Sequence, residues 1–328
     1  MSDGPLLETR NLVKYYPVIE RGIVRRKQVG VVKAVDHVSF MMSRGETLGL
    51  VGETGCGKTT LAKTILNLIQ PTSGEVFFKG VNISQIFASK NRKQILNLRR
   101  SMQLIFQDPY LSLNPRWTVA DIITEAFRIH KHVPQSEWTS TLLKTLKLVG
   151  LEEYHAYKYP HEFSGGQRQR IGIARALAVD PEFIVCDEPV SSLDVSVRSQ
   201  ILNLLAELKE ELDLTYLYIS HDLSTVWHIC SRVAVMYLGK VVELGDVDDL
   251  FHSPLHPYTK ILMGAVLIAD PKVQTQRFTL AGEVPSAINP PSGCRFHTRC
   301  PIAQPYCSDK EPELREITKN HFVACHEV

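Results

Sequence analysis

The chain lacks a long apolar run, a dominant charge of one sign and a recognisable secretory signal. No stretch approaches the roughly 18 consecutive apolar residues of a membrane-spanning helix, so a chain embedded in the bilayer is not expected. The formal net charge is only +2 over 328 residues, which argues against nucleic-acid binding through one large basic face. Residues 1–5 lack the basic and apolar regions of a signal peptide, so we expect the chain to stay in the cytoplasm.

Cysteine is sparse over most of the chain and concentrated at its end. Three of the seven cysteines, Cys56, Cys186 and Cys230, are scattered through the first part. Because the cytoplasm is reducing, we expect these three to be small buried thiols and not disulfide partners. The other four lie close to the C-terminus and require a separate explanation.

The composition is that of an ordinary globular protein, with 44% hydrophobic and 22% charged residues. The length predicts one large domain and a smaller appendage. Short apolar runs alternate with helical patterns, which predicts an α/β fold built on a mostly parallel sheet. We expect strands at residues 6–12, 31–40, 47–51, 74–80, 102–106, 183–186, 215–219, 233–238 and 240–244, the last two closing the sheet.

Helical patterns fill the remaining segments. Helices are expected at residues 119–130 and 137–149, inside a helical insertion that spans residues 110–163. A further helix at residues 195–212 has apolar residues at intervals of three and four, as packing on a sheet requires. The basic stretch at residues 20–27 is expected to be a solvated loop between two strands, with a contact to a lipid head group or a partner as the alternative. A small appended module is expected from about residue 281.

Residues 52–60 read Gly-Glu-Thr-Gly-Cys-Gly-Lys-Thr-Thr between a predicted strand and a predicted helix, the context of a phosphate-binding loop. Its glycines permit positive φ and turn N–H groups inward as an anion nest, to which the helix N-terminus adds. Lys58 can reach the β- and γ-phosphates, and the Thr59 hydroxyl can bind Mg²⁺. A chance glycine-rich turn would not explain both flanking elements. The predicted nucleotide-binding residues of the loop are Gly52, Glu53, Thr54, Gly55, Cys56, Gly57, Lys58, Thr59 and Thr60.

Two acids follow the apolar run at residues 183–186. Asp187 is placed to bind a metal beside the phosphates, and Glu188 to polarise an attacking water. Mere capping of a strand end is the alternative. Residues 164–167 read Ser-Gly-Gly-Gln at the start of a helix, where Ser164 can cap the helix and the glycines leave bare N–H groups. The sequence therefore predicts a second anion site.

This order of motifs resembles the ATP-binding cassette (ABC) family. Residues 52–59 match the Walker A motif of that family, Asp187 its Walker B aspartate and Glu188 its catalytic glutamate, while residues 164–167 match its signature. Gln107 matches the Q-loop glutamine and His221 the switch histidine.

Two further matches complete the set. Residues 192–194 match the D-loop, and Tyr16 resembles the aromatic residue that stacks on adenine, with Tyr15 as the alternative. The resemblance implies ATP and Mg²⁺ as ligands. It implies catalytic roles for Lys58, Gln107, Glu188 and His221, Mg²⁺ binding by Thr59, Gln107 and Asp187, and nucleotide binding by Tyr16, Ser164, Gly165, Gly166, Gln167 and Asp194.

The implied fold is a P-loop NTPase of ABC type, with an antiparallel β subdomain and a helical subdomain beside the mostly parallel core, plus a small cysteine-rich C-terminal module. The implied nucleotide-binding domain covers residues 1–250, with the helical subdomain at about 108–165. Residues 251–328 form a C-terminal extension.

Residues 107–116, 253–259, 282–286 and 293–301 narrow the resemblance to the ATPase subunits of dipeptide, oligopeptide and nickel importers. That family implies a second ABC ATPase subunit, the same or a homologous chain, and two transmembrane permease subunits. It also implies an extracytoplasmic solute-binding protein, a peripheral location on the cytoplasmic face of the membrane and no nucleic-acid partner. An importer of nickel or oligosaccharide, a soluble cassette ATPase without a transport role, and a metalloregulatory module remain alternatives.

The four C-terminal cysteines, Cys294, Cys300, Cys307 and Cys325, can ligate an iron–sulfur cluster or zinc. Gaps of five and six residues between the first three are wider than those of zinc knuckles, and a proline follows Cys300 as in ferredoxins. The family resemblance implies a [4Fe–4S] cluster, with zinc or unliganded thiols as alternatives. His297, His321 and His326 lie close enough in sequence to compete as ligands and are expected to be loop histidines.

Overall fold

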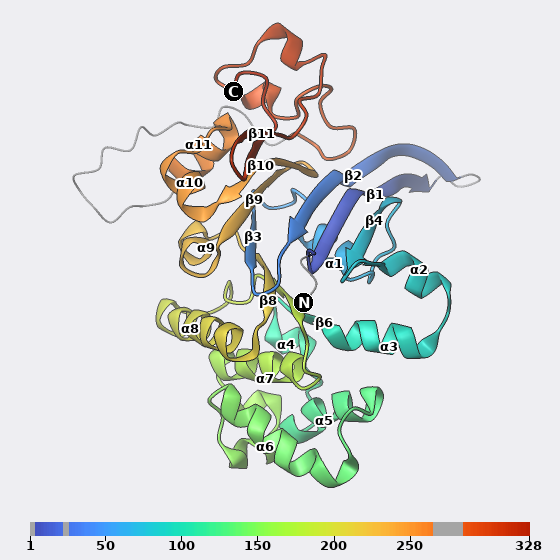
Figure 1. Cartoon of the computed structure of the whole chain (residues 1–328), viewed down its shortest axis with the longest axis vertical. Helices are drawn as coiled ribbons and strands as arrows, with labels where there is room; N and C mark the ends of the chain where they lie inside the picture. Colours follow the sequence, from blue (N-terminus) through green and yellow to red (C-terminus); the bar gives the residue numbers. More distant parts are fainter. Residues whose placement is uncertain (1–3, 22–25, 265–284) are drawn as a thin grey trace, which may run out of the picture. The chain divides into compact units, whose positions relative to one another are not determined.

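The computed structural model describes residues 4–21, 26–264 and 285–328 (Figure 1). The chain divides into two compact units. Unit 1 comprises Met1–Met42, Leu48–Ile83 and Ser220–Val328, and unit 2 comprises Ser43–Thr47 and Ser84–Ile219. Within the described ranges, no helix is long and apolar enough to cross a membrane.

Unit 1 contains an antiparallel sheet of four strands in the order β2-β1-β4-β5. Figure 1 labels β2, β1 and β4 of this sheet. Its strands are β1 (Leu7–Arg21), β2 (Arg26–Met42), β4 (Ser73–Phe78) and β5 (Val81–Asn82). The prediction of a loop over residues 20–27 is wrong at both ends, because Glu20 pairs with Lys27. Residues 22–25 lie outside the described residues. Antiparallel pairing needs only backbone hydrogen bonds, so polar residues can extend such a ribbon.

Unit 1 also contributes five neighbouring strands, in the order β3-β9-β10-β12-β11, to a larger second sheet. These strands are β3 (Thr47–Val51), β9 (Arg232–Tyr237), β10 (Lys240–Asp246), β12 (His321–Val323) and β11 (Arg315–Thr318). β3 and β9 are parallel, and the other pairs are antiparallel. The prediction that residues 240–244 close the sheet is wrong, because β12 pairs with β10. Strands as short as β11 and β12 leave no readable alternation in the sequence.

The helices of unit 1 include α1 (Lys58–Ile65), α9 (Leu223–Ile229), α10 (Val247–His252) and α11 (Pro257–Gly264), with the 3₁₀ turns η4 (His297–Arg299) and η5 (Pro305–Cys307). α1 directly follows the glycine loop and buries Leu61, Ala62 and Ile65. The predicted order of strand, loop and helix is confirmed here. The predicted start of the appended module, near residue 281, lies outside the described residues.

Unit 2 has three parallel strands, β6 (Met102–Ile105), β7 (Phe183–Asp187) and β8 (Thr215–Ile219). All five residues of β7 and of β8 are buried, and each strand reads as a run of four largely apolar residues beside one polar residue, Asp187 or Thr215. This parallel core was predicted, and its strand positions are confirmed to within one or two residues.

The α-helices of unit 2 are α3 (Arg92–Ser101), α4 (Pro109–Ser112), α5 (Val119–His130), α6 (Trp138–Leu148), α7 (Gly165–Leu177) and α8 (Val195–Leu212). The helix α2 (Ile83–Ala88) also belongs to unit 2 except for its first residue. The 3₁₀ turns of unit 2 are η1 (Gln135–Glu137), η2 (Glu153–Tyr157) and η3 (Pro160–Glu162). α5 and α8 match the predicted bounds. Sequence reasoning missed α3, a very polar helix that buries only Leu98. Its N-cap, Asn91, was the available signal.

A buried glutamate joins three segments of unit 1. Glu243 on β10 is fully buried, and its carboxylate accepts the backbone N–H groups of Leu255 at 2.8 Å and His256 at 3.0 Å. His321 Nε2 lies 2.7 Å from the same carboxylate. The prediction of His321 as a loop histidine is wrong, because it lies in β12 and is 4% exposed. A buried carboxylate needs such partners.

His256 provides a pH-dependent contribution to stability. Its Nδ1 accepts the N–H of Tyr258 at 3.0 Å at the start of α11. Burial, assisted by Lys260, lowers the pKa of His256 to about 3. On acidification, His256 is therefore protonated near pH 6.5 in the unfolded chain but only near pH 3 in the folded chain. The free energy of unfolding falls as the pH drops from about 6.5 toward 3. We expect the titration of His256 to lower the free energy of unfolding by roughly 2 kcal/mol between pH 7 and pH 5.

Chemical denaturation at several pH values checks this expectation. His256→Asn keeps a capping acceptor and removes the titrating ring, so its stability should fall less between pH 7 and pH 5. His228→Asn, on the exposed surface of α9, is the control. Equal pH dependence of His256→Asn and the wild type would contradict the assignment.

Candidate functional site

The glycine loop of unit 1 is fixed by close backbone contacts. Gly52 has φ 147° and Gly57 has φ 111°, and a Cβ at these positions would lie 2.1 Å from the Met236 carbonyl oxygen and 2.0 Å from the Ala34 carbonyl oxygen. Gly55 has φ 83° and open space around it. At Gly52 and Gly57, therefore, both the positive φ and the lack of room for a Cβ require glycine, whereas at Gly55 only the positive φ favours it.

Lys58 is the first residue of α1, and its side chain lies back over the loop. Its Nζ donates to the Gly52 carbonyl at 2.7 Å and to the Glu53 carbonyl at 3.3 Å, and the residue is 6% exposed. Gly57, the N-cap of α1, provides no side-chain cap. The helix N-terminus therefore keeps N–H groups that can receive an anion. Thr54 and Gly55 form the exposed tip of the loop.

Glu53 is bound to other parts of unit 1 by both its backbone and its side chain. Its N–H donates to the Tyr258 hydroxyl at 2.9 Å. Its carboxylate accepts two hydrogen bonds from Arg299, at 2.9 and 3.3 Å. Sequence reasoning missed Tyr258 and Arg299, although both lie in stretches that carried the family resemblance. Direct binding of nucleotide by Glu53 stays a prediction.

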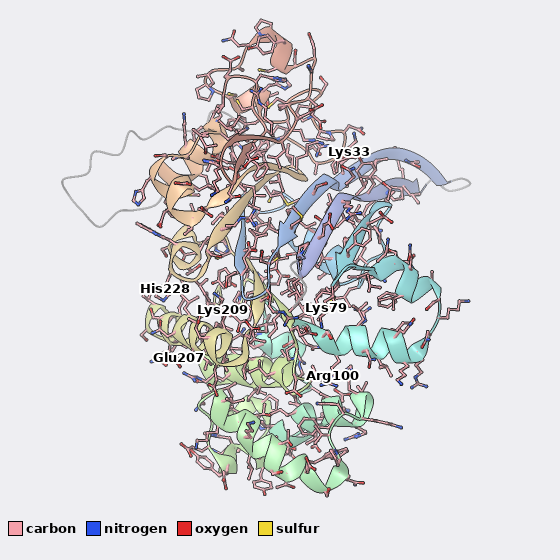
Figure 2. The ribbon with its side chains drawn as sticks, in the orientation of Figure 1. Lys33, Lys79, Arg100, Glu207, Lys209 and His228 are labelled. Carbon is pink, nitrogen blue, oxygen red and sulfur yellow. The ribbon has the colours of Figure 1, made fainter. Side chains whose placement is uncertain are left out.

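The two neighbouring tyrosines of β1 have different surroundings. The Tyr15 hydroxyl donates to Asp36 at 2.5 Å, and burial together with this bond raises the Tyr15 pKa. Lys33, labelled on β2 in Figure 2, has its Nζ 5.7 Å from the Tyr15 ring centroid. The Tyr16 ring is half-buried, with Lys14 Nζ 4.9 Å from its centroid. Tyr15 is thus tied into the sheet, which favours Tyr16 as the predicted stacking residue.

His221 is exposed at the start of the turn before α9. The preceding Ser220 donates its N–H to the carbonyl of Leu50, on β3, at 3.3 Å. Asp222 then caps α9 by accepting from Ser224 N at 3.0 Å. These contacts hold the backbone on both sides of His221 within unit 1.

In unit 2 the structure brings together two predicted residues that are far apart in the sequence. Gln107 Nε2 donates to Glu188 Oε2 at 2.9 Å across a separation of 81 residues. Asp187 ends β7 and is 6% exposed. Glu188 has φ 47°, a left-handed conformation that is uncommon for residues other than glycine, and its N–H donates to the Ile219 carbonyl at 3.0 Å. Such backbone outliers occur preferentially at functional sites.

The predicted signature residues form a capped and tightly packed helix start in unit 2. Ser164 and Gln167 cap each other's backbone N–H groups at the start of α7. A Cβ at Gly166 would lie 2.3 Å from a methyl carbon of Val197 on α8, so any other residue would require that side chain to move. Asp194 caps α8 by accepting from Val197 N at 3.0 Å, and this bond, with one from Ser196, lowers the Asp194 pKa.

The four C-terminal cysteines lie within electrostatic range of one another. Burial, followed by the other three cysteines, raises the Cys294 pKa to about 11. Burial and neighbouring cysteines also raise the pKa values of Cys300 and Cys325. Cys294 N donates to the Cys307 carbonyl at 2.8 Å.

These thiols do not form a metal site as they are placed. Among the residues that the structure describes, no group of three or more His, Cys, Asp or Glu could hold a metal ion. The histidines that could compete as ligands have other partners. His297 Nδ1 lies 2.8 Å from the Cys294 carbonyl, His326 Nε2 lies 2.9 Å from the Lys310 carbonyl, and His321 binds Glu243.

Comparison with known proteins identifies the class. Residues 35–191 match the family model described as ABC transporter, and residues 242–307 match that of the oligopeptide/dipeptide transporter C-terminal region. A dimeric structure of the ATP-binding cassette MJ0796 in a post-hydrolysis state, bound to ADP and Pi, aligns with a TM-score of 0.63 and 27% identity over 74% of this chain and 98% of that one. The fold is that of an ATP-binding cassette.

Relatives along the whole chain narrow this class. The oligopeptide transport ATP-binding protein AppF of Bacillus subtilis is 52% identical over 98% of this chain and 97% of its own length. A putative peptide import ATP-binding protein of Brucella ovis is 47% identical over 99% of this chain and 98% of its own length. The chain belongs to the ABC transporter family, as one of its ATP-hydrolysing subunits of the oligopeptide/dipeptide group.

Substitution of the loop glycines tests the packing argument. We expect Gly57→Ala to lower the unfolding temperature strongly, because its Cβ would overlap the Ala34 carbonyl at 2.0 Å. Gly55→Ala has the same unfavourable sign of φ but open space, so it should cost only about 1–2 kcal/mol. Thermal unfolding without nucleotide provides the measurement. Similar losses for both variants would mean that backbone angle alone, and not contact, fixes the loop.

Proposed function

We propose that this chain is the ATP-hydrolysing subunit that powers uptake of di- and oligopeptides through a binding-protein-dependent ABC importer. The supporting observation is the 52% identity to an oligopeptide transport ATP-binding protein over nearly the full length of both chains. An importer of another solute, nickel or oligosaccharide, uses the same chemistry and is the alternative. A soluble cassette ATPase has no comparable support from these relatives.

The glycine loop is proposed to bind the ATP phosphates. Its N–H groups and the uncapped start of α1 supply partial positive charge, and Lys58 Nζ would exchange the carbonyls of Gly52 and Glu53 for phosphate oxygens. Mg²⁺, when bound, neutralises phosphate charge, and Thr59, Gln107 and Asp187 are the residues proposed to hold it. The buried carboxylate of Asp187 suits this hard cation, which prefers oxygen ligands.

Glu188 is proposed to orient the attacking water, which displaces ADP from the γ-phosphate in line. In the structure its carboxylate accepts a hydrogen bond from Gln107, so movement of Gln107 would change the availability of Glu188. His221 is proposed to contact the γ-phosphate, and Tyr16 to stack on adenine.

We propose that two such ATPases, identical or homologous, pair so that the loop of one chain and residues 164–167 of the other enclose each ATP. Asp194 would lie at the same interface. The pair would act with two transmembrane permease subunits and, through them, an extracytoplasmic binding protein, at the cytoplasmic face of the membrane. The proposed nucleotide-binding domain covers residues 1–250, with residues 251–328 as its extension.

The helical subdomain at about residues 108–165 is proposed to contact the permease. In unit 2 a hollow of about 740 Å³ lies between α5, α6 and η2. Tyr154 and Tyr157, which line it, are 58% and 79% exposed. Exposed aromatic residues beside a hollow are typical of protein-binding surfaces.

Glu188→Gln tests the proposed mechanism. Loss of the carboxylate should lower ATP turnover by about 10²–10⁴-fold, the usual contribution of a positioned acid or base, and should leave ATP binding in place. Glu182→Gln is the control, because it removes an equal charge at the start of β7, where Glu182 pairs with Arg44 at 2.7 Å. Near-normal turnover by Glu188→Gln would refute the mechanism.

The same variants test the transport role after reconstitution with the permease subunits and binding protein. ATP-dependent uptake of a labelled peptide should occur with the wild type and with Glu182→Gln, and should be lost with Glu188→Gln. Uptake of nickel or an oligosaccharide, without peptide uptake, would support the alternative solute.

We further propose that the C-terminal segment acts as a cysteine-rich module in which Cys294, Cys300, Cys307 and Cys325 bind a [4Fe–4S] cluster, with zinc as the alternative. Four sulfur donors suit either group. The pKa values of Cys294, Cys300 and Cys325 are raised by burial, and a bound metal would deprotonate its thiol ligands.

Anaerobic purification tests this proposal. The protein should absorb in the visible range and contain iron and acid-labile sulfide in equal amounts, and Cys300→Ser should lose both. Cys230→Ser, a buried cysteine outside the set, should retain them. Colourless protein containing zinc would replace the cluster with the alternative, and colourless protein without metal would refute both.

A further inference from the structure

Arg299, in the C-terminal segment, forms a buried bidentate ion pair with the glycine loop. Its two terminal nitrogens bind the two oxygens of the Glu53 carboxylate at 2.9 and 3.3 Å, across 246 residues of sequence. Arg299 is only 6% exposed in its side chain, and that of Glu53 is 22% exposed. One Arg299 nitrogen also donates to the Tyr237 hydroxyl at 3.4 Å. Charge-assisted pairs of this geometry are the strong and directional ones.

The turn that carries Arg299 is anchored in a buried aromatic cluster. Phe296, three residues earlier, is buried against the rings of Tyr237 and Tyr258, with centroids at 5.3 and 5.4 Å. Tyr258 is the residue whose hydroxyl accepts the Glu53 N–H. The backbone and the side chain of Glu53 are therefore held by one aromatic cluster and by the arginine that this cluster anchors.

A second arginine of the same segment supports Cys56, three residues further along the loop, through an intervening turn. Arg295 is buried, pairs with Asp36 and donates to the carbonyl of Leu238. Gly239, which follows Leu238 in the chain, donates its N–H to the Cys56 carbonyl at 2.8 Å. Arg295 thus fixes the turn that binds Cys56, while Arg299 fixes Glu53. The tip between these two residues, Thr54 and Gly55, is exposed.

We propose that Arg299 is a positioning residue for the phosphate loop, so that the C-terminal segment sets the affinity of this subunit for ATP. Lys58 Nζ binds the backbone carbonyls of Gly52 and Glu53, and Arg299 binds the side chain of the same Glu53. Without Arg299, the Glu53 carboxylate loses its partner and the loop has more conformations to restrict on binding phosphate. The inference rests on the proposed function of the loop as the phosphate site.

The expected effect is on binding more than on turnover. Arg299→Ala should raise the Kd and the KM for MgATP by about tenfold, as expected for the loss of a charge-assisted pair. The kcat at saturating ATP should change far less, because Gln107 and Glu188 form their contact inside unit 2. A merely structural role would lower the folded fraction, and hence the apparent kcat, without raising Kd.

Isothermal titration with MgATP and steady-state kinetics on the full chain test the proposal. Glu53→Gln keeps the size of the side chain and loses its charge, so it should weaken binding as Arg299→Ala does, and the double variant should be no weaker than either single variant. Arg299→Lys should restore part of the affinity, since one of the two hydrogen bonds can form. Arg10→Ala removes a matched bidentate pair with Glu8, on the surface of β1, and should bind as the wild type does.

The outcomes separate this inference from the proposed function. If Lys58→Ala binds MgATP as the wild type does, the loop is not the phosphate site and both fail. If Lys58→Ala loses binding while Arg299→Ala and Glu53→Gln keep the wild-type Kd, only the positioning role fails. Additive losses in the double variant would likewise overturn it, because they would show that the two residues act independently. If Arg299→Ala does not fold, Glu53→Gln and Arg299→Lys decide the question.

Discussion

The closeness of the glycine loop to neighbouring backbone is the constraint on which the rest of unit 1 depends. The loop passes so near the carbonyls of Ala34 and Met236 that no Cβ fits at Gly57 or Gly52. This contact fixes where the N–H groups of the loop point, and hence where an anion can be bound. It couples the loop to β2 and β9, so that changes in those strands reach the loop directly.

The C-terminal segment is packed into unit 1 through both sheet pairing and buried polar contacts. It adds β12 and β11 to the sheet beside β10, and the buried carboxylate of Glu243 binds both β12 and the start of α11. Arg299 then reaches from this segment to Glu53 in the glycine loop, and Arg295 binds the carbonyl of Leu238, next to the Gly239 N–H that binds Cys56. Buried ion pairs of this kind are costly to break because each leaves an uncompensated charge. The ATPase core and its extension therefore share one set of polar contacts.

Sequence reasoning worked best where local pattern and local structure coincide. The parallel strands and helices such as α5 and α8 could be predicted because burial imposes a period or a continuous apolar run on them. It failed for α3, which buries one side chain, and for the short strands β11 and β12. The role of His321 was also missed, since its partner Glu243 is 78 residues away.

The sequence by itself indicated the chemistry of the candidate site, because the glycine loop, the two acids at the end of β7 and the capped start of α7 are each contiguous and locally encoded. Only the tertiary structure decided which residues support that chemistry. Gln107 meets Glu188 across 81 residues, and Arg299 meets Glu53 across 246. Such pairs leave no periodic signal, because ion pairs and hydrogen bonds depend on distance in space and not on spacing along the chain.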